Sequence, residues 1–133
     1  IDRAINVNEV CDVNPLGVVA TMAAYTQGAE WLEQLLEYLL ANYQAFITYA
    51  REHFPQFPVA RLEGTYLAWM DCSSLGVPVE ELEHRLRKEA KLWLNAGTMY
   101  GTTGEGYVRW NLACPRARML EGLGRFGRWV EMR

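Results

Sequence analysis

The sequence predicts an α+β fold: a small antiparallel or mixed sheet of three to four strands, with helices packed on one face and a long helix before it. Three observations predict this fold. Apolar residues recur every three or four positions over about 29–53, as in an amphipathic helix. Short extended runs follow at 59–72 and 107–112. Further helical patterns occupy about 79–90 and 116–129.

Two helical patterns occupy the N-terminal part of the chain. The first begins within residues 14–17, and Gly28 interrupts it. The second is predicted over about 29–53, and it ends before Pro55 because proline cannot continue the backbone hydrogen-bond ladder. Its apolar stripe is broader than one small sheet requires. We therefore expect part of this helix to pack on something outside the chain.

The centre of the chain predicts a hairpin and then a helix. Residues 59–63 and 66–72 form two extended runs on either side of Gly64 and Thr65, which favour a turn or bulge. The helix over about 79–90 follows a proline. It carries acidic residues in its first turns and basic residues near its end, which suits the helix dipole.

The last third of the chain predicts two strands and a closing helix. Residues 92–94 have the pattern of a short buried strand, and 107–112 that of another. A helix is predicted over about 116–129, although glycine lowers helix propensity. The glycines concerned are Gly122, Gly124 and Gly127.

Composition narrows the class of protein. The 133 residues suit one domain, and a hydrophobic content of 50% excludes a disordered chain. A net charge of -3 disfavours a nucleic-acid partner, and apolar runs shorter than the ~18 residues of a membrane span disfavour a membrane protein. Three widely spaced cysteines, Cys11, Cys72 and Cys114, favour free thiols in a cytoplasmic protein. The first residue is Ile1, from which we expect a processed chain or a piece of a longer one.

A glycine-rich loop at 97–106 precedes the strand at 107–112. Closely spaced glycines let a backbone approach a ligand, but the loop lacks the pattern of a P-loop or a dinucleotide site. A flexible connection between two strands is the alternative interpretation. The spacing of the histidines and cysteines predicts no metal site, and His53 and His84 are expected in solvent.

The strand at 107–112 carries a candidate binding residue. Strand alternation places Val108 and Trp110 on the buried face and Arg109 and Asn111 on the other. A planar guanidinium is well suited to hold a carboxylate through two parallel hydrogen bonds. A surface or internal ion pair of Arg109 is the alternative, and the spacing alone leaves both open.

Several segments together carry a resemblance to one family. They are residues 14–17 with 23–32, then 63–71, then 94–101, and finally 106–116, which contains Gly-Tyr-Val-Arg-Trp-Asn-Leu-Ala-Cys-Pro-Arg. The chain resembles the C-terminal part of fold-type I pyridoxal-phosphate (PLP) enzymes. Within the class I/II aminotransferase superfamily, it is most similar to the cystathionine β-lyase (C–S lyase) branch.

This resemblance implies a domain organisation. Residues 1–28 would be the end of the large-domain region with its connecting helix, and 29–133 would be the C-terminal small domain. The family's large domain carries the lysine that forms the Schiff base with PLP. Lys88 and Lys91, the two lysines of this sequence, lie in the wrong motif for that role. We therefore expect the chain by itself to be inactive and to bind no PLP specifically.

The resemblance also implies roles for individual residues. Arg109 takes the position of the arginine that binds the substrate α-carboxylate, with Asn111 as a possible support. Thr65 and Tyr66 belong to a turn near the active-site mouth. Ala96 departs from the family, where many relatives have proline before the glycine, and so does the bulky Trp110.

The implied function is that of a parent C–S β-lyase, in which PLP acts as an electron sink during β-elimination from an amino-acid thioether such as cystathionine. The parent is expected to be a cytoplasmic homodimer. One alternative is a PLP-dependent aminotransferase acting on an amino donor. Another, of a different class, is a stand-alone binding module without catalytic activity.

Overall fold

The computed structural model describes residues 14–132, which divide into two units between Glu37 and Tyr38. In the first unit, α2 (Pro15–Gln27) confirms the first predicted helix. Asn14 caps it, because its Oδ1 accepts a hydrogen bond from the Leu16 amide at 2.9 Å. The domain division predicted after residue 28 stays a prediction.

The long predicted helix is α3 (Ala29–His53), with the predicted bounds. Its residues up to Glu37 belong to the first unit, where the apolar side chains of Trp31, Leu32 and Leu36 are exposed. A covering partner for these side chains stays a prediction.

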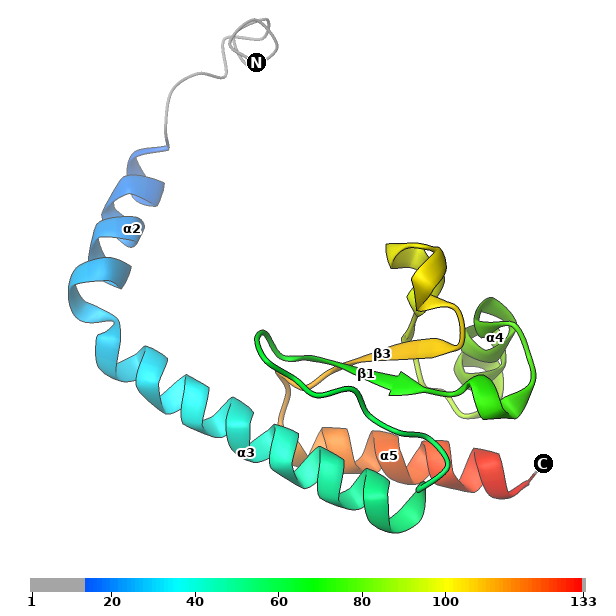
Figure 1. The fold of residues 1–133 in the computed structure, drawn as a ribbon. Coiled ribbons are helices and arrows are strands. Elements are labelled where there is room, and N and C mark those ends of the chain that lie inside the picture. The colour runs from blue at the N-terminus through cyan, green and yellow to red at the C-terminus, as the bar shows by residue number, and fades with distance from the viewer. Residues whose placement is uncertain (1–13, 133) are drawn as a thin grey trace, which may run out of the picture. The chain divides into compact units, whose positions relative to one another are not determined.

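The second unit contains a three-stranded antiparallel sheet, which confirms the predicted fold class (Figure 1). Its strands are β1 (Leu67–Asp71), β2 (Asn95–Ala96) and β3 (Tyr107–Asn111), with β3 in the middle. The strand predicted at 107–112 is therefore the central one, and both neighbouring strands can place side chains beside it.

Three helical segments pack on one face of this sheet. They are the part of α3 after Glu37, α4 (Val79–Glu89) and α5 (Arg116–Glu131), which confirm the predicted helices. Figure 1 shows α3 and α5 running beside one another under β1 and β3. The core between these layers includes Phe46, Ala68, Met70, Leu82, Leu86, Val108, Trp110, Leu123, Phe126 and Trp129.

The glycines of α5 have a packing role that explains why the helix tolerates them. A Cβ on Gly127 would lie 2.9 Å from the Phe54 ring, and a Cβ on Gly122 would lie 3.4 Å from the Trp110 ring. The ring of Phe54, which follows α3, and the ring of Trp110 on β3 thus pack directly against the backbone of α5. The bulky Trp110 is buried, as predicted, and Gly122 makes room for it.

A buried amide joins α3 to the connection between β3 and α5. Asn42 is fully buried, and its Nδ2 donates to the carbonyl oxygens of Leu112 at 2.9 Å and Cys114 at 3.0 Å. Its Oδ1 accepts a hydrogen bond from the Arg116 Nε at 3.1 Å. Each polar atom of this side chain is therefore paired, as burial requires.

The prediction of a strand at 59–63 is wrong. Val59 alone forms a bridge, with Met70, and Ala60 donates one hydrogen bond to the Trp69 carbonyl. The Leu62 amide instead donates to the Tyr43 hydroxyl of α3 at 3.1 Å. The next backbone donor, the Leu62 amide, is thus bonded to a side chain of α3, and the backbone leaves the sheet after Ala60.

The prediction of a buried strand at 92–94 is also wrong. Lys91 has φ +53°, in the left-handed region, and the Leu92 amide donates back to the Leu86 carbonyl at 3.1 Å. The last turn of α4 therefore takes the Leu92 amide, and the backbone at 91–94 turns away from the helix instead of pairing in a sheet. Trp93 is 76% exposed, and β2 begins later, at Asn95.

Two predictions concern the cysteines and the membrane. Cys72 and Cys114 are free thiols, as expected, while Cys11 lies outside the described residues. Burial, together with the neighbouring Asp71 carboxylate, raises the pKa of the Cys72 thiol to about 12. Within residues 14–132, no helix is long and apolar enough to cross a membrane.

Candidate functional site

Arg109 lies at the centre of the sheet, on the face opposite the helices. Its neighbours in sequence, Val108 and Trp110, are buried in the core, so alternation along β3 turns the Arg109 side chain the other way. This confirms the predicted division of the strand into two faces. Arg109 pairs with Trp69 across β1 and with Asn95 across β2.

Two contacts hold the half-buried guanidinium of Arg109. Its Nη2 donates to the Asn95 Oδ1 at 3.3 Å, and its Cζ lies 4.3 Å from the centroid of the Tyr100 ring. Among the described residues, no carboxylate lies within 4.0 Å of this guanidinium. An intra-protein ion pair, the alternative role of Arg109, is therefore absent from this part of the chain.

The loop between β2 and β3 brings Tyr100 over Arg109. It folds into two short 3-10 turns, η2 (Gly97–Tyr100) and η3 (Thr102–Gly104). The backbones of the two turns touch, since a Cβ on Gly97 would lie 2.1 Å from the Gly104 carbonyl oxygen. Only glycine permits this approach, so the glycine content of the loop serves its own folding.

The same loop is attached to the N-terminal end of α4. The Glu105 carboxylate accepts a hydrogen bond from the Val79 amide at 3.1 Å, and the Thr98 hydroxyl donates to the Glu80 carboxylate. The hydrogen bond from Thr98 lowers the pKa of the Glu80 carboxyl. These contacts fix the loop at both of its turns, and the position of Tyr100 with it.

Aromatic side chains extend the surface beside Arg109. The Trp69 ring meets the Tyr100 ring edge-on, with centroids 5.5 Å apart, and the Tyr107 ring at 6.5 Å. A cavity of about 400 Å³ adjoins these rings, and it is lined by Ala60, Trp69, Tyr100, Thr103, Gly104 and Tyr107. Next to the cation there is thus space for an apolar group.

The other predicted site residues lie away from this cluster. The Asn111 Oδ1 accepts a hydrogen bond from the Ala113 amide at 2.8 Å, so this side chain shapes the chain after β3. The Thr65 Oγ1 accepts from the Leu67 amide at 3.2 Å. Tyr66 is exposed, and its carbonyl accepts from the Leu112 amide at 2.9 Å. The structure brings none of the three into contact with Arg109.

Three residues of the cluster were not predicted from the sequence: Trp69, Asn95 and Tyr100. Each reaches Arg109 through a contact that crosses the sheet or the loop. The alternation of β1 signals which face Trp69 occupies, but strand register decides what lies beside it. No local signal places the Tyr100 ring on a guanidinium nine residues later.

The lysines of the chain do not fit the role of a Schiff-base residue for PLP. Both lie at the end of α4, where the Lys91 Nζ donates to the Lys88 carbonyl at 2.9 Å. Both are exposed, and neither contacts Arg109 or the loop that covers it. Neither lysine is therefore suited to be the covalent anchor for the cofactor.

Comparison with known proteins shows that the chain is similar to one part of longer PLP-dependent proteins. No protein-family model matches it. It is 34% identical over 118 residues to "Cystathionine beta-lyase PatB" of Bacillus subtilis, covering 89% of this chain and 30% of that protein. A PLP-bound chain from Clostridium difficile 630, provisionally named an aminotransferase, shares 44% identity with a TM-score of 0.87, covering 93% of this chain and 32% of that one.

A third relative is the PLP-bound C–S lyase of Staphylococcus hominis. It shares 30% identity with a TM-score of 0.81, over 94% of this chain and 33% of that one. The chain thus spans about a third of the length of the proteins it matches. Over that third, it is related to the cystathionine β-lyase (C–S lyase) branch of the PLP-dependent aminotransferase superfamily.

Proposed function

We propose that this chain forms the part of a PLP-dependent C–S β-lyase that binds the α-carboxylate of an amino-acid thioether such as cystathionine. Arg109 makes the binding contact. The observation that carries this proposal is a half-buried guanidinium with no carboxylate within 4.0 Å among residues 14–132.

The contacts of Arg109 leave its guanidinium ready for a carboxylate. Asn95 takes one N–H of the planar group, and the Tyr100 ring covers one of its faces. The remaining N–H groups can donate to both oxygens of a substrate carboxylate, which is the bidentate geometry that arginine favours. Because the sheet and the ring fix the plane of the guanidinium, the bound amino acid is oriented as well as held.

The neighbouring cavity suits the side chain of the same substrate. The rings of Trp69, Tyr100 and Tyr107 line it, and Tyr100 touches both the cavity and the guanidinium. An amino acid with its carboxylate on Arg109 would place its thioether chain against these rings. Thr65, Tyr66 and Asn111 have no direct part in this arrangement and act on the site through the ends of β1 and β3.

The cofactor is held by residues outside this chain. PLP is present in the solved relatives, but Lys88 and Lys91 do not fit the Schiff-base role. We infer that the intact protein supplies this lysine from its large domain, and that 1–28 and 29–133 are the end of that domain and the small domain. The chain by itself would then be inactive.

The intact protein is proposed to be a cytoplasmic homodimer that acts on amino acids and not on nucleic acids or membranes. An acidic chain with a net charge of -3 favours a partner other than a polyanion. The homodimer rests on the resemblance to the family. Size-exclusion chromatography with light scattering on the full-length protein tests it directly.

The choice of lyase over aminotransferase rests on the relatives. Curated relatives at 34% identity include "Cystathionine beta-lyase PatB" of Bacillus subtilis and "Cystathionine beta-lyase" of Corynebacterium glutamicum, whereas "Aspartate aminotransferase" of Pyrococcus horikoshii is 26% identical. The PLP-bound chain from Clostridium difficile 630, at 44% identity, carries an aminotransferase name, so the aminotransferase is kept as the alternative that the assay decides. A stand-alone binding module is the remaining alternative. A continuous upstream reading frame with a Schiff-base lysine would exclude the module.

The proposal is tested with Arg109→Ala in the full-length protein, assayed for thiol and keto-acid release from cystathionine. Loss of the charge pair, worth about 2–4 kcal/mol, should lower kcat/KM roughly 30- to 1000-fold, mainly through KM. The PLP absorption spectrum should stay unchanged, since Arg109 binds substrate and not cofactor.

The matched control is Arg118→Ala, which removes an exposed arginine from α5 and should leave the kinetics unchanged. A variant at Arg109 that loses PLP but handles cystathionine normally once reloaded would show that the role is wrong. Amino transfer to a keto acid without thiol release would instead replace the lyase by the aminotransferase.

A further inference from the structure

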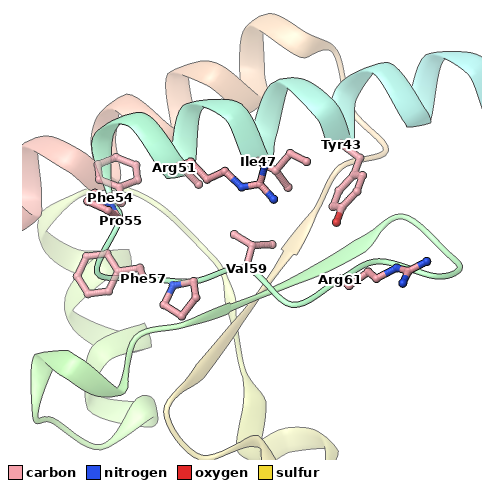
Figure 2. Close-up of a pocket in the computed structure, with 10 residues that line it drawn as sticks. Tyr43, Ile47, Arg51, Phe54, Pro55, Phe57, Val59 and Arg61 are labelled. Atoms are coloured by element: carbon pink, nitrogen blue, oxygen red, sulfur yellow. The ribbon is translucent and has the colours of Figure 1, made fainter.

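A second cavity lies within the second unit, on the helix-covered side of the sheet, between α3 and the segment 54–61 (Figure 2). We call it the α3 cavity. Its volume is about 460 Å³, within the range of roughly 300–1,000 Å³ that is typical of small-molecule sites. The residues that line it are Tyr43, Ile47, Ala50, Arg51, Phe54, Pro55, Phe57, Pro58, Val59 and Arg61.

The α3 cavity is separate from the Arg109 site. Val59 bridges Met70, and both side chains lie on the helix-covered face of the sheet, because residues that oppose each other across strands share a face. Arg109 and Trp69 lie on the opposite face. A ligand in the α3 cavity would therefore not occupy the carboxylate site proposed above.

The apolar wall of the cavity is rigid. Phe54 and Phe57 are buried, and each meets Phe126 of α5 edge-on, with ring centroids 5.3 Å and 5.5 Å apart. Ile47 and Val59 are half-buried and face one another across the cavity in Figure 2. Residues fixed in this way form a preformed surface for an apolar group, at little entropic cost on binding.

Two arginines give the cavity a positive rim. In Figure 2 the Arg51 guanidinium extends from α3 toward Val59, and within residues 14–132 it has no ion pair. Arg61 lies on the opposite wall and pairs with Glu63 at 3.9 Å, with both side chains largely exposed. Such an exposed pair is weak, so Glu63 cancels little of the positive charge that Arg61 brings to the rim of the cavity.

The backbone adds polar groups on the same wall. In the bridge between Val59 and Met70, the hydrogen bonds are made by the flanking residues, from Ala60 to Trp69 and from Asp71 to Pro58. The N–H and C=O of Val59 therefore point away from β1, to the outer edge of the sheet. A donor and an acceptor thus border an otherwise apolar wall.

From this combination we propose that the α3 cavity binds a small amphipathic monocarboxylate. An aromatic or branched aliphatic group of the ligand packs between Ile47 and Val59, and its carboxylate pairs with Arg51, while Arg61 adds positive charge on the opposite wall. Charge complementarity selects the anion, and the volume limits it to a ligand of small-molecule size.

The test uses 4-phenylbutyrate and its neutral amide, 4-phenylbutanamide, titrated calorimetrically into the full-length protein. The protein carries Arg109→Ala, so that the other carboxylate site does not contribute. We expect saturable binding of the acid at millimolar concentrations and about tenfold weaker binding of the amide. Arg51→Gln should weaken binding of the acid by about threefold to tenfold, and Arg61→Gln by about twofold to threefold.

The matched control, Arg118→Gln, should leave binding of the acid unchanged. Since all three arginines are exposed, the variants should fold normally, which circular dichroism verifies. Equal affinities for acid and amide, unchanged affinity in both arginine variants, or no saturable binding would each overturn the proposal. The readout is binding alone, so these results are independent of whether the parent is a lyase.

Discussion

Replacing Asn42 by leucine should destabilise the second unit by about 2–4 kcal/mol. Leucine has a similar shape and preserves the packing, but it removes both donors that Asn42 supplies to the carbonyl groups of Leu112 and Cys114. The change therefore isolates the hydrogen bonds from the effect of a cavity.

The magnitude follows from the burial of the two acceptors. A buried carbonyl that loses its donor costs about 1–3 kcal/mol. Leu112 is buried, so its carbonyl should cost an amount near the upper part of that range, whereas Cys114 is half-buried and water can replace part of the loss. Arg116 is exposed, so its Nε can turn to water and adds little.

Native-state hydrogen exchange is the assay, because it measures the opening free energy of individual segments in a protein with several domains. A loss of about 2–4 kcal/mol should speed exchange of the protected amides of β3 and α5 by roughly 30- to 1000-fold. Gln44→Leu, on an exposed position of the same helix, is the control. If Asn42→Leu exchanged as slowly as Gln44→Leu, the buried amide would have no stabilising role and the reasoning would be refuted.

Two further predictions concern the loop and a cysteine. Gly97→Ala should lower kcat/KM about 10- to 100-fold, because its Cβ would meet the Gly104 carbonyl at 2.1 Å and shift the loop that covers the carboxylate site. The control is Gly64→Ala, whose Cβ would have no atom within 4 Å and which should leave kcat/KM unchanged. Equal steady-state kinetics in the two variants would contradict this prediction. Because burial raises its pKa to about 12, the Cys72 thiol should react with iodoacetamide at pH 8 at least ~100-fold more slowly than the half-buried Cys114 thiol. Peptide mass spectrometry measures the labelling of each cysteine. Comparable labelling of the two would contradict the prediction and show that the Cys72 thiol is accessible.

The helices could be predicted from the sequence because their signals are local. The apolar period over 29–53 predicts α3 with its observed bounds, and proline marks its end. The glycines of α5 lower its propensity, yet packing against Phe54 and Trp110 more than compensates for the lower propensity.

The strands at 59–63 and 92–94 were predicted wrongly because backbone donors in both segments are taken by partners other than a strand. The Leu62 amide pairs with Tyr43, nineteen residues earlier in the chain, and not with a strand. The last turn of α4 takes the Leu92 amide, since Lys91 adopts a left-handed conformation. Apolar composition describes both segments equally well as strands, because it carries no information on which partner takes each donor.

For the site, the sequence by itself determined that Arg109 is a cation on the non-core face of a strand, since alternation depends on the backbone of that strand alone. The tertiary structure decided what surrounds it. Asn95 reaches the guanidinium through the register of β2, and Tyr100 through two glycine-dependent turns attached to α4. Side-chain contacts between distant segments depend on how those segments pack, which local patterns in the sequence do not specify.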